Sequence, residues 1–285
     1  MILQSEILKI AEVEGVPPDT IDKNWVLGHF LAELYKAEWA RNYLIFKGGT
    51  CLKKCYFPDY RFSEDLDFTL NKADFQITNK LLQSVCDTIS AQTGILFSKV
   101  KIDALTWENN QVGYATHIRF WGANHRKNQQ PPDSDRWHTA IKIEIVFYEL
   151  LVNISENRPL YSDYSDNKIF ENTIIPCYSI SEMAAEKFRA LLQRSYPAPR
   201  DYYDLWYLLK QKEIDRDRIV ETFKLKATFK NIKFNNYDNF FDSQQIKKVK
   251  QAWQNSLKQH LSEEKFPDVT VAIEELRDIC SKINW

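Results

Sequence analysis

The chain has 285 residues, enough for one large domain or two smaller ones, each with a buried core. Hydrophobic residues make up 44% of the chain and aromatic residues 14%, which excludes an intrinsically disordered protein. The 38 Lys and Arg nearly balance the 39 Asp and Glu, so a protein that is basic over its whole surface is excluded, although a local basic patch is not.

The first half of the sequence predicts a helical start followed by the strands of a sheet. Apolar residues at helical spacing predict a helix over residues 21–36, with Asp22 as its N-cap. Residues 43–46 predict a short buried strand, Gly48 and Gly49 a tight turn, and residues 50–56 the start of a helix. Alternation of apolar and polar residues, or an amphipathic pattern, predicts the remaining elements. These are strands over 65–70, 97–105, 112–122 and 141–151, a helix over 75–94, and a hairpin loop over 126–137.

The second half predicts helices. A capping box of Ser179 and Glu182 opens a helix over residues 179–194, and another helix follows over 200–212. No strand pattern of comparable length follows, so we expect a domain boundary near residue 175. The predicted fold class is α+β, with a mixed β-sheet flanked by helices in residues 1–175 and an α-helical domain in residues 176–285.

Cysteine usage and hydropathy predict a reduced, cytoplasmic protein that is not bound to a membrane. The five cysteines contain no C-x-x-C pair, and the N-terminal residues lack the apolar core of a signal peptide. No apolar run approaches the roughly 18 residues that a membrane-spanning helix needs. Cys51 and Cys55, four residues apart on a predicted helix, are expected to be half-buried apolar residues and not ligands of a structural zinc.

The segment FKGGTCLKKCYFPDYRFSEDLDF, from Phe46 to Phe68, combines a glycine turn with two carboxylates. On the predicted strand, Asp65 and Asp67 point to the same side, roughly 6–7 Å apart, so both can reach one hard cation. Gly48 and Gly49 allow the backbone to approach a phosphate closely. A D-x-D pair alone is also typical of a solvated strand. The combination of turn, helix and D-x-D favours metal-assisted transfer of a phosphoryl or nucleotidyl group.

At these residues the chain resembles the AbiEii-type nucleotidyltransferase toxins of abortive-infection and type IV toxin–antitoxin systems, within the polymerase-beta-like nucleotidyltransferase superfamily. The first family motif is present as KGGTCLK, beginning at Lys47, followed by RFSEDLDF, beginning at Arg61. A carboxylate on a later strand resembles Glu144 in IKIEI, and a Lys on a later helix resembles Lys187. The R-D-x-x-D-L motif resembles residues 200–205. The resemblance covers about residues 20–210.

The resemblance implies a nucleotidyltransferase-like sheet, a nucleoside triphosphate as substrate, and Mg²⁺, or Mn²⁺ in its place, as cofactor. The implied metal ligands are Asp65, Asp67 and Glu144; Glu144 has the alternative role of orienting an acceptor hydroxyl. The implied catalytic residues are Asp65, Asp67, Glu144, Lys187 and Asp204. The implied nucleotide-binding residues are Lys47, Gly48, Gly49, Thr50, Lys53, Arg61, Ser63 and Lys187. For Lys187 a solvated surface role stays open, as do a helix cap for Asp201 and a pair with Arg200 for Asp204.

The acceptor and the partner are also implied by the resemblance. The expected acceptor is RNA, most plausibly the 3′ end of a tRNA, and the protein would inhibit growth until bound by an antitoxin. Residues 210–260 contain twelve Lys or Arg against six Asp or Glu, interleaved with aromatic residues, and this composition suits RNA as well as an ordinary solvated helix. Two alternatives remain: a phosphotransferase acting on a protein or small molecule, and a catalytically silent binding module.

Overall fold

The computed structural model describes residues 2–126 and 128–285. They form two compact units, the first comprising Met1–Glu149 and Ser155–Cys177, the second Leu150–Ile154 and Tyr178–Trp285. The sequence predicts a boundary near residue 175, and in the structure the short segment Leu150–Ile154 also belongs to the second unit. Among the described residues, no helix is both long and apolar enough to cross a membrane.

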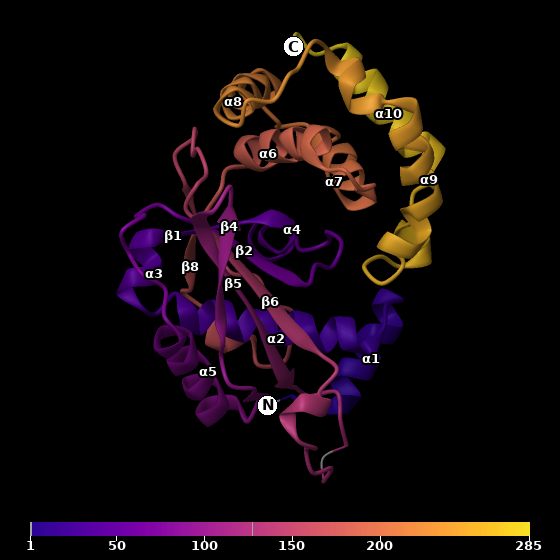
Figure 1. The fold of residues 1–285 in the computed structure, drawn as a ribbon. Helices are drawn as coiled ribbons and strands as arrows, with labels where there is room; N and C mark the ends of the chain where they lie inside the picture. Colours follow the sequence, from indigo (N-terminus) through magenta and orange to yellow (C-terminus); the bar gives the residue numbers. More distant parts are fainter. Residues whose placement is uncertain (1, 127) are drawn as a thin grey trace. The chain divides into compact units, whose positions relative to one another are not determined.

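The first unit is built of helices and a mixed sheet (Figure 1). Its helical segments are α1 (Gln4–Glu14), α2 (Pro18–Leu34), α3 (Glu38–Tyr43), α4 (Gly48–Cys51), the π-helical turn η1 (Leu52–Tyr56), α5 (Asn79–Thr93) and the 3-10 turns η2 (Ser134–Arg136) and η3 (Asn167–Phe170). Its strands are β1 (Leu44–Lys47), β2 (Asp65–Leu70), β3 (Leu96–Phe97), β4 (Ile102–Trp107), β5 (Asn110–Trp121), β6 (Ala140–Val146), β7 (Glu156–Pro159) and β8 (Ile174–Cys177).

These strands form one sheet in the order β3-β5-β6-β2-β1-β8-β7, with β4 also paired to β5. The central pairs β2–β6 and β1–β8 are parallel, whereas β1–β2, β5–β6 and β7–β8 are antiparallel. Strand β1 is buried along its whole length, as expected for a strand at the centre of a sheet. The α+β class and the mixed sheet flanked by helices are therefore confirmed.

Helices pack on the sheet and hold in place the segments that carry the motif residues. Helix α2 packs against α1, α5 and strand β6 (Figure 1). Helix α4 and the turn η1 follow directly after β1 and pack against β1, β2 and β7. The π-helical turn is a rare conformation that often marks a functional segment. The glycine turn is thus held on the central strands of the sheet.

Two local predictions for the first unit, an N-cap and a strand, differ from the structure. Helix α2 begins at Pro18, so Asp22 is not its N-cap but a buried residue that accepts a hydrogen bond from the backbone N–H of Ala123 at 2.7 Å. The strand predicted over 97–105 is broken into β3 and β4. The loop predicted over 126–137 connects β5 to β6, although Lys127 within it lies outside the described residues.

The second unit is helical (Figure 1). Helix α6 packs against α7 and α8, and α7 packs against α9 and α10. Its elements are α6 (Ile180–Gln193), α7 (Pro199–Leu209), α8 (Arg216–Phe229), the 3-10 turn η4 (Tyr237–Phe241), α9 (Ser243–Leu257), the 3-10 turn η5 (Glu263–Lys265) and α10 (Val269–Ser281).

A buried ion pair ties the segment Leu150–Ile154 to this helical unit. Ser179 caps α6 as predicted, because its hydroxyl accepts a hydrogen bond from the backbone N–H of Glu182. The Glu182 carboxylate does not close the predicted capping box; it accepts hydrogen bonds from the backbone N–H groups of Val152 and Asn153 and lies 2.8 Å from the Lys226 ammonium. Both charged side chains are fully buried, so each depends on the other for neutralisation.

An aromatic cluster forms the core of the second unit. Phe188, Phe223, Phe240 and the C-terminal Trp285 lie with ring centroids 4.8–6.3 Å apart. Phe234 joins the same cluster through Phe240 and Trp285. Phe234 and Phe240, two aromatic residues of segment 210–260 that were expected to suit RNA, are therefore part of a hydrophobic core.

Candidate active site

Three carboxylates lie on one face of the central strands. Asp65 and Asp67 alternate on β2, and Glu144 on the parallel neighbour β6 is the register partner of Asp67. Register partners on adjacent strands project to the same side, about 4.8 Å apart. We call Asp65, Asp67 and Glu144 the carboxylate triad. All three side chains are partly exposed, so a ligand can reach them.

Lys142 lies at the carboxylate triad and was not among the predicted site residues. It is the register partner of Asp65, and its ammonium lies 2.6 Å from the Glu144 carboxylate. Burial favours the neutral amine, but the hydrogen bond to Glu144 and the charges of the triad raise the pKa of Lys142 above its ordinary value. The alternation in IKIEI, which puts Lys142 and Glu144 on one face, was the signal that could have identified it.

The glycine turn lies directly against the carboxylate triad. Gly48 has φ +81°, and a Cβ atom at this position would lie 2.4 Å from Oδ2 of Asp67. Two independent features therefore require glycine at position 48: the left-handed backbone conformation and the close approach of the Asp67 carboxylate. The hydroxyl of Thr50 donates a hydrogen bond of 2.6 Å to the backbone carbonyl of Asp65. The turn and β2 are thus held together at the point where the two aspartates begin.

The second half of the motif supports the same turn from the other side. A Cβ atom at Gly49 would lie 2.9 Å from Nη2 of Arg61 and 2.9 Å from the hydroxyl of Ser63. Arg61 is buried and donates a hydrogen bond of 3.0 Å to the carbonyl of Phe62. Gly49 therefore leaves room for the two side chains that follow in the motif.

The predicted lysines of the motif are placed differently from one another. Lys47 is the register partner of Asp67 on β1, so its side chain projects on the face of the carboxylate triad. Lys53 points elsewhere: it donates a hydrogen bond to the carbonyl of Pro58 and lies 4.5 Å from the ring centroid of Phe62. Lys53 and Lys54 line a cavity of about 660 Å³ formed with α1 and residues 161–167. Among the predicted phosphate ligands, Lys47 is the lysine that shares the face of the triad.

The remaining predicted residues form an ion network in the second unit. The Lys187 ammonium lies 2.5 Å from Oδ2 of Asp204 and 3.2 Å from Oδ1 of Asp201. Asp201 also pairs with Arg194, whereas Asp204 is 0% exposed. Lys187, whose side chain is 13% exposed, is therefore a counter-ion of these aspartates and not a solvated surface lysine, and Asp204 pairs with Lys187 instead of Arg200.

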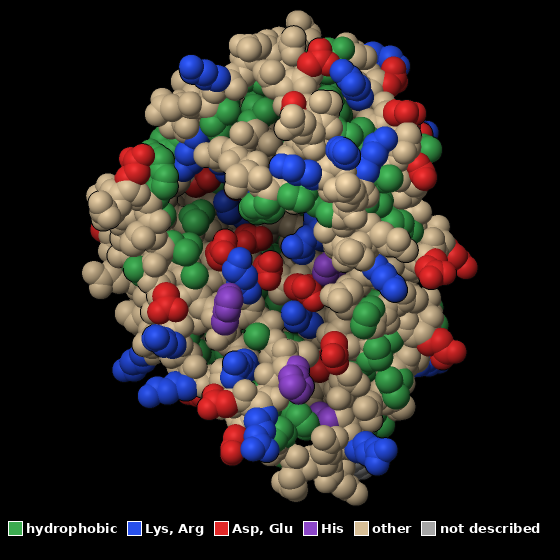
Figure 2. Space-filling model, turned by 45° about the vertical axis from the view of Figure 1, so that its right-hand side comes forward, with side chains coloured by type: hydrophobic (Ala, Val, Ile, Leu, Met, Phe, Trp, Pro, Cys, Tyr) green, Lys and Arg blue, Asp and Glu red, His purple; other side chains and the backbone are tan. Residues whose placement is uncertain are grey.

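Fewer basic and aromatic side chains of segment 210–260 are accessible to RNA than its composition suggested. Phe240 and Phe241 are buried, and Lys226 is paired with Glu182 inside the unit. Helix α9 contains no acidic residue. Its exposed lysines are Lys247, Lys248 and Lys250. On the face that Figure 2 shows, Lys and Arg side chains are interspersed with Asp and Glu. The basic surface is therefore local.

The donor set of the carboxylate triad fits a hard divalent cation. Carboxylate oxygens are the ligands that Mg²⁺ and Mn²⁺ prefer, and Mg²⁺ usually takes one or two of them together with phosphate oxygens. The Lys142 ammonium shows that this face already attracts a cation. Gly48 lets the Asp67 carboxylate lie against the backbone, where any side chain at position 48 would displace it. The residues present are thus suited to a metal bound to a triphosphate.

Comparisons with known proteins identify a sequence family and solved structures that this chain resembles. The sequence model of one family, described as nucleotidyl transferase AbiEii toxin, type IV TA system, matches residues 29–275. No curated protein sequence matches the chain significantly. A solved structure with a similar fold is MenT4, a nucleotidyltransferase toxin from Mycobacterium tuberculosis; it has a TM-score of 0.67, 16% identity, and coverage of 100% of this chain and 91% of that chain. An antigenic nucleotidyltransferase-like protein from Paracoccidioides brasiliensis aligns with a TM-score of 0.37, 13% identity, and coverage of 89% and 93%.

Proposed function

The chain belongs to the AbiEii family of nucleotidyltransferase toxins from type IV toxin–antitoxin systems, and on that premise we propose that it moves a nucleotide from a nucleoside triphosphate to the 3′ end of a tRNA in a Mg²⁺-dependent reaction. The observation that supports this proposal most is the carboxylate triad, with the glycine turn packed against Asp67. The same family membership suggests a separate antitoxin as partner.

We assign each residue of the proposed site a role that its placement supports. Asp65, Asp67 and Glu144 would hold the Mg²⁺, which when bound supplies charge neutralisation at the triphosphate and polarises the phosphorus under attack. Lys47, on the face of Asp67, adds a fixed positive charge for the phosphates. Lys142 can exchange Glu144 for a phosphate oxygen, because its ammonium already lies at the triad. Gly48 makes room beside the turn for the Asp67 carboxylate, and Gly49 makes room for Arg61 and Ser63.

The residues of the second unit enter the proposal through the family motif. Lys187 is the candidate phosphate contact there, and Asp204 and Asp201 act as positioning residues because their carboxylates hold its ammonium. Arg61 and Ser63 act as positioning residues of the glycine turn, since both lie beside Gly49. Lys53 remains a predicted nucleotide contact on the motif alone, because its ammonium bonds the Pro58 carbonyl.

The proposed reaction is a single displacement at the α-phosphorus. The oxygen of the acceptor 3′-hydroxyl forms a bond to the α-phosphorus, the bond from that phosphorus to the bridging oxygen breaks, and pyrophosphate leaves. The hydroxyl proton passes to water. Positioning of the hydroxyl and the triphosphate, with stabilisation of the developing charge, supplies most of the rate enhancement in such reactions.

The position of a radioactive label distinguishes the proposed activity from phosphoryl transfer. The protein is incubated with total RNA, purified tRNA and protein substrates, using each nucleoside triphosphate labelled at either the α- or the γ-phosphate. Nucleotidyl transfer to tRNA predicts label from the α-position only. Label from the γ-position would show a phosphotransferase, and binding without any transfer would show a silent module.

A matched acceptor control locates the reaction on the tRNA. Periodate oxidation destroys the 3′-terminal diol and leaves the rest of the tRNA intact. The proposal predicts that oxidised tRNA accepts no label, whereas it still competes with intact tRNA for binding. Labelling of oxidised tRNA at the level of intact tRNA contradicts the 3′ end as acceptor.

A further inference from the structure

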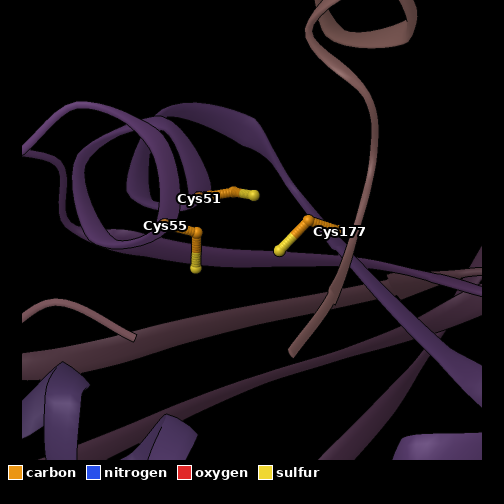
Figure 3. Close-up of side chains that lie close together, drawn as sticks. All are labelled: Cys51, Cys55 and Cys177. Atoms are coloured by element: carbon orange, nitrogen blue, oxygen red, sulfur yellow. The ribbon is translucent and has the colours of Figure 1, made fainter. Parts of the chain in front are cut away.

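Three cysteines lie together in the interior of the first unit, and their sulfur atoms are close enough to bind a single metal ion. Cys51 is the last residue of α4, Cys55 lies in the turn η1, and Cys177 is the last residue of β8. Their sulfur atoms all lie within 4.8 Å of one another, and each residue is 0% exposed. Figure 3 shows the sulfurs gathered between the helical turn and the strand.

The arrangement differs from that of isolated core cysteines. The chain has two other cysteines, Cys86 and Cys280, which are also buried but belong to different helices and are not members of the group. Cys51 and Cys55 lie four residues apart, and the π-helical turn sets the position of Cys55 relative to Cys51. Cys177 comes from strand β8, more than a hundred residues later in the sequence. The fold therefore brings three thiols together, while Cys86 and Cys280 provide buried thiols for comparison.

We propose that Cys51, Cys55 and Cys177 form a three-thiolate site for one thiophilic d¹⁰ cation, of the class of Zn²⁺, Cd²⁺ and Cu⁺. With metal–sulfur bonds of about 2.3 Å, the sulfurs of a three-coordinate complex lie about 4 Å apart, so thiols within 4.8 Å need to move by less than about 1 Å. Sulfur-only ligand sets select soft cations over Mg²⁺. Among the described residues, no His, Asp or Glu joins the group, which leaves sulfur as the sole ligand type.

Nearby cations offset the charge of such a complex. Three thiolates and one divalent ion carry one net negative charge, which is costly to bury unless it is compensated. Arg158 donates a hydrogen bond of 3.3 Å from Nε to the backbone carbonyl of Cys55. Lys54, the residue before Cys55, is buried with its ammonium 2.9 Å from Oδ1 of Asn24. Two basic residues therefore lie beside the segment that carries Cys55.

The position of the group gives a bound ion a structural effect. Cys51 follows Gly48 by three residues, and Cys177 is the register partner of Phe46 on β1. An ion held by all three thiols would cross-link the helical turn after Gly48 to strand β8. The thermal midpoint of the first unit should rise with the concentration of free ion, because the ion binds the folded chain in preference to the unfolded one.

The test is a titration of the reduced full-length protein with Cd²⁺ under anaerobic conditions, on the folded chain and during refolding. The proposal predicts a sulfur-to-cadmium charge-transfer absorption that saturates at one equivalent, release of thiol protons, and a higher thermal midpoint. Cys177→Ala and Cys55→Ala should each lose or weaken the saturating absorption. Cys86→Ala removes a buried thiol of the same unit outside the group and should titrate like the parent protein.

Two results would overturn the proposal. One is a parent protein that shows no saturating absorption in either titration. The other is an absorption that persists in both Cys177→Ala and Cys55→Ala, or that Cys86→Ala removes equally. Since oxygen ligands give no sulfur charge-transfer absorption, Cd²⁺ at the carboxylate triad does not mimic the expected signal. None of these readouts uses nucleotide transfer, so they stand or fall separately from the proposed enzyme activity.

Discussion

Replacement of Lys187 by Met should strongly destabilise the second unit. Lys187 lies 2.5 Å from Oδ2 of Asp204, whose side chain is 0% exposed, and 3.2 Å from Oδ1 of Asp201. Met keeps most of the aliphatic stem but removes the charge. Loss of one partner of a buried ion pair costs about 3–5 kcal/mol, because the other charge stays buried without compensation. Asp201 keeps Arg194 as a partner, so most of this loss should arise at Asp204.

The magnitude can be measured by urea unfolding followed by circular dichroism, with hydrogen exchange to locate the effect. Exchange should accelerate in α6 and α7, which carry the network, before it does in the sheet of the first unit. The double variant Lys187→Met/Asp204→Asn removes both charges and should regain most of the lost free energy of unfolding. The double variant is the control that separates charge from packing.

Two outcomes would refute this reasoning. If Lys187→Met unfolds within about 0.5 kcal/mol of the parent protein, the buried Asp204 does not depend on Lys187. If the double variant is as unstable as the single one, lost packing and not an unpaired charge explains the effect. The double variant also tests phosphate binding by Lys187: a stable double variant that transfers no nucleotide supports a direct role, and a stable, active one assigns Lys187 to structure alone.

Three further predictions follow from the geometry of single sites. Gly48→Ala should abolish nucleotide transfer, because the added methyl group would collide with the Asp67 carboxylate. Gly94→Ala meets a similar positive φ at the end of α5, so it should cost about 1–2 kcal/mol of stability but leave transfer intact. Urea unfolding measures the stability of each variant, and transfer of the α-label measures its activity. Burial raises the pKa of Asp22 from 3.8 to about 6, so the folded state holds that proton more tightly than the unfolded state does. Protonated Asp22 therefore stabilises the folded state below pH 4, and this contribution is lost as the pH rises through 6. The free energy of unfolding of Asp22→Asn, relative to that of the parent, should therefore increase by on the order of 3 kcal/mol between pH 4 and 7. Urea unfolding at each pH measures this difference, and a difference that does not change with pH contradicts the prediction. Charge reversal of three exposed lysines of α9 should weaken tRNA binding and reduce its salt dependence, without changing triphosphate binding. Filter binding at several salt concentrations measures both effects. An unchanged tRNA affinity would show that α9 is not the docking surface. These lysines are Lys247, Lys248 and Lys250.

Elements with a strong local pattern could be predicted from the sequence. Strand β2 has the predicted bounds, because the alternation of DLDFTL matches the two faces of a buried sheet. The placement of Glu144 beside Asp67 was also accessible, since a later strand with an inward carboxylate was expected to join the same sheet. Strands β7 and β8 were not predicted: each has four residues, too few for a periodic signal, and pairing within the sheet stabilises them.

Features that depend on contacts between distant segments were out of reach. The pairing of Lys187 with Asp204 requires the packing of α6 against α7, and the spacing within one helix does not reveal it. The aromatic residues of segment 210–260 looked suited to base stacking, but Phe240 packs against Phe188 in the core. The grouping of Cys177 with Cys51 arises from the pairing of β8 with β1, which sequence spacing cannot show.

The central claim is that the carboxylate triad carries out nucleotide transfer, and Asp67→Asn tests it most directly. The substitution keeps the size of the side chain and removes one charge that would hold the metal. With α-labelled triphosphate and tRNA, the account predicts that transfer falls by orders of magnitude, while the thermal midpoint without ligand stays level or rises slightly. Asp74→Asn, an exposed aspartate in the loop after β2, is the matched control and should transfer like the parent. Transfer by Asp67→Asn at the rate of Asp74→Asn would contradict the account.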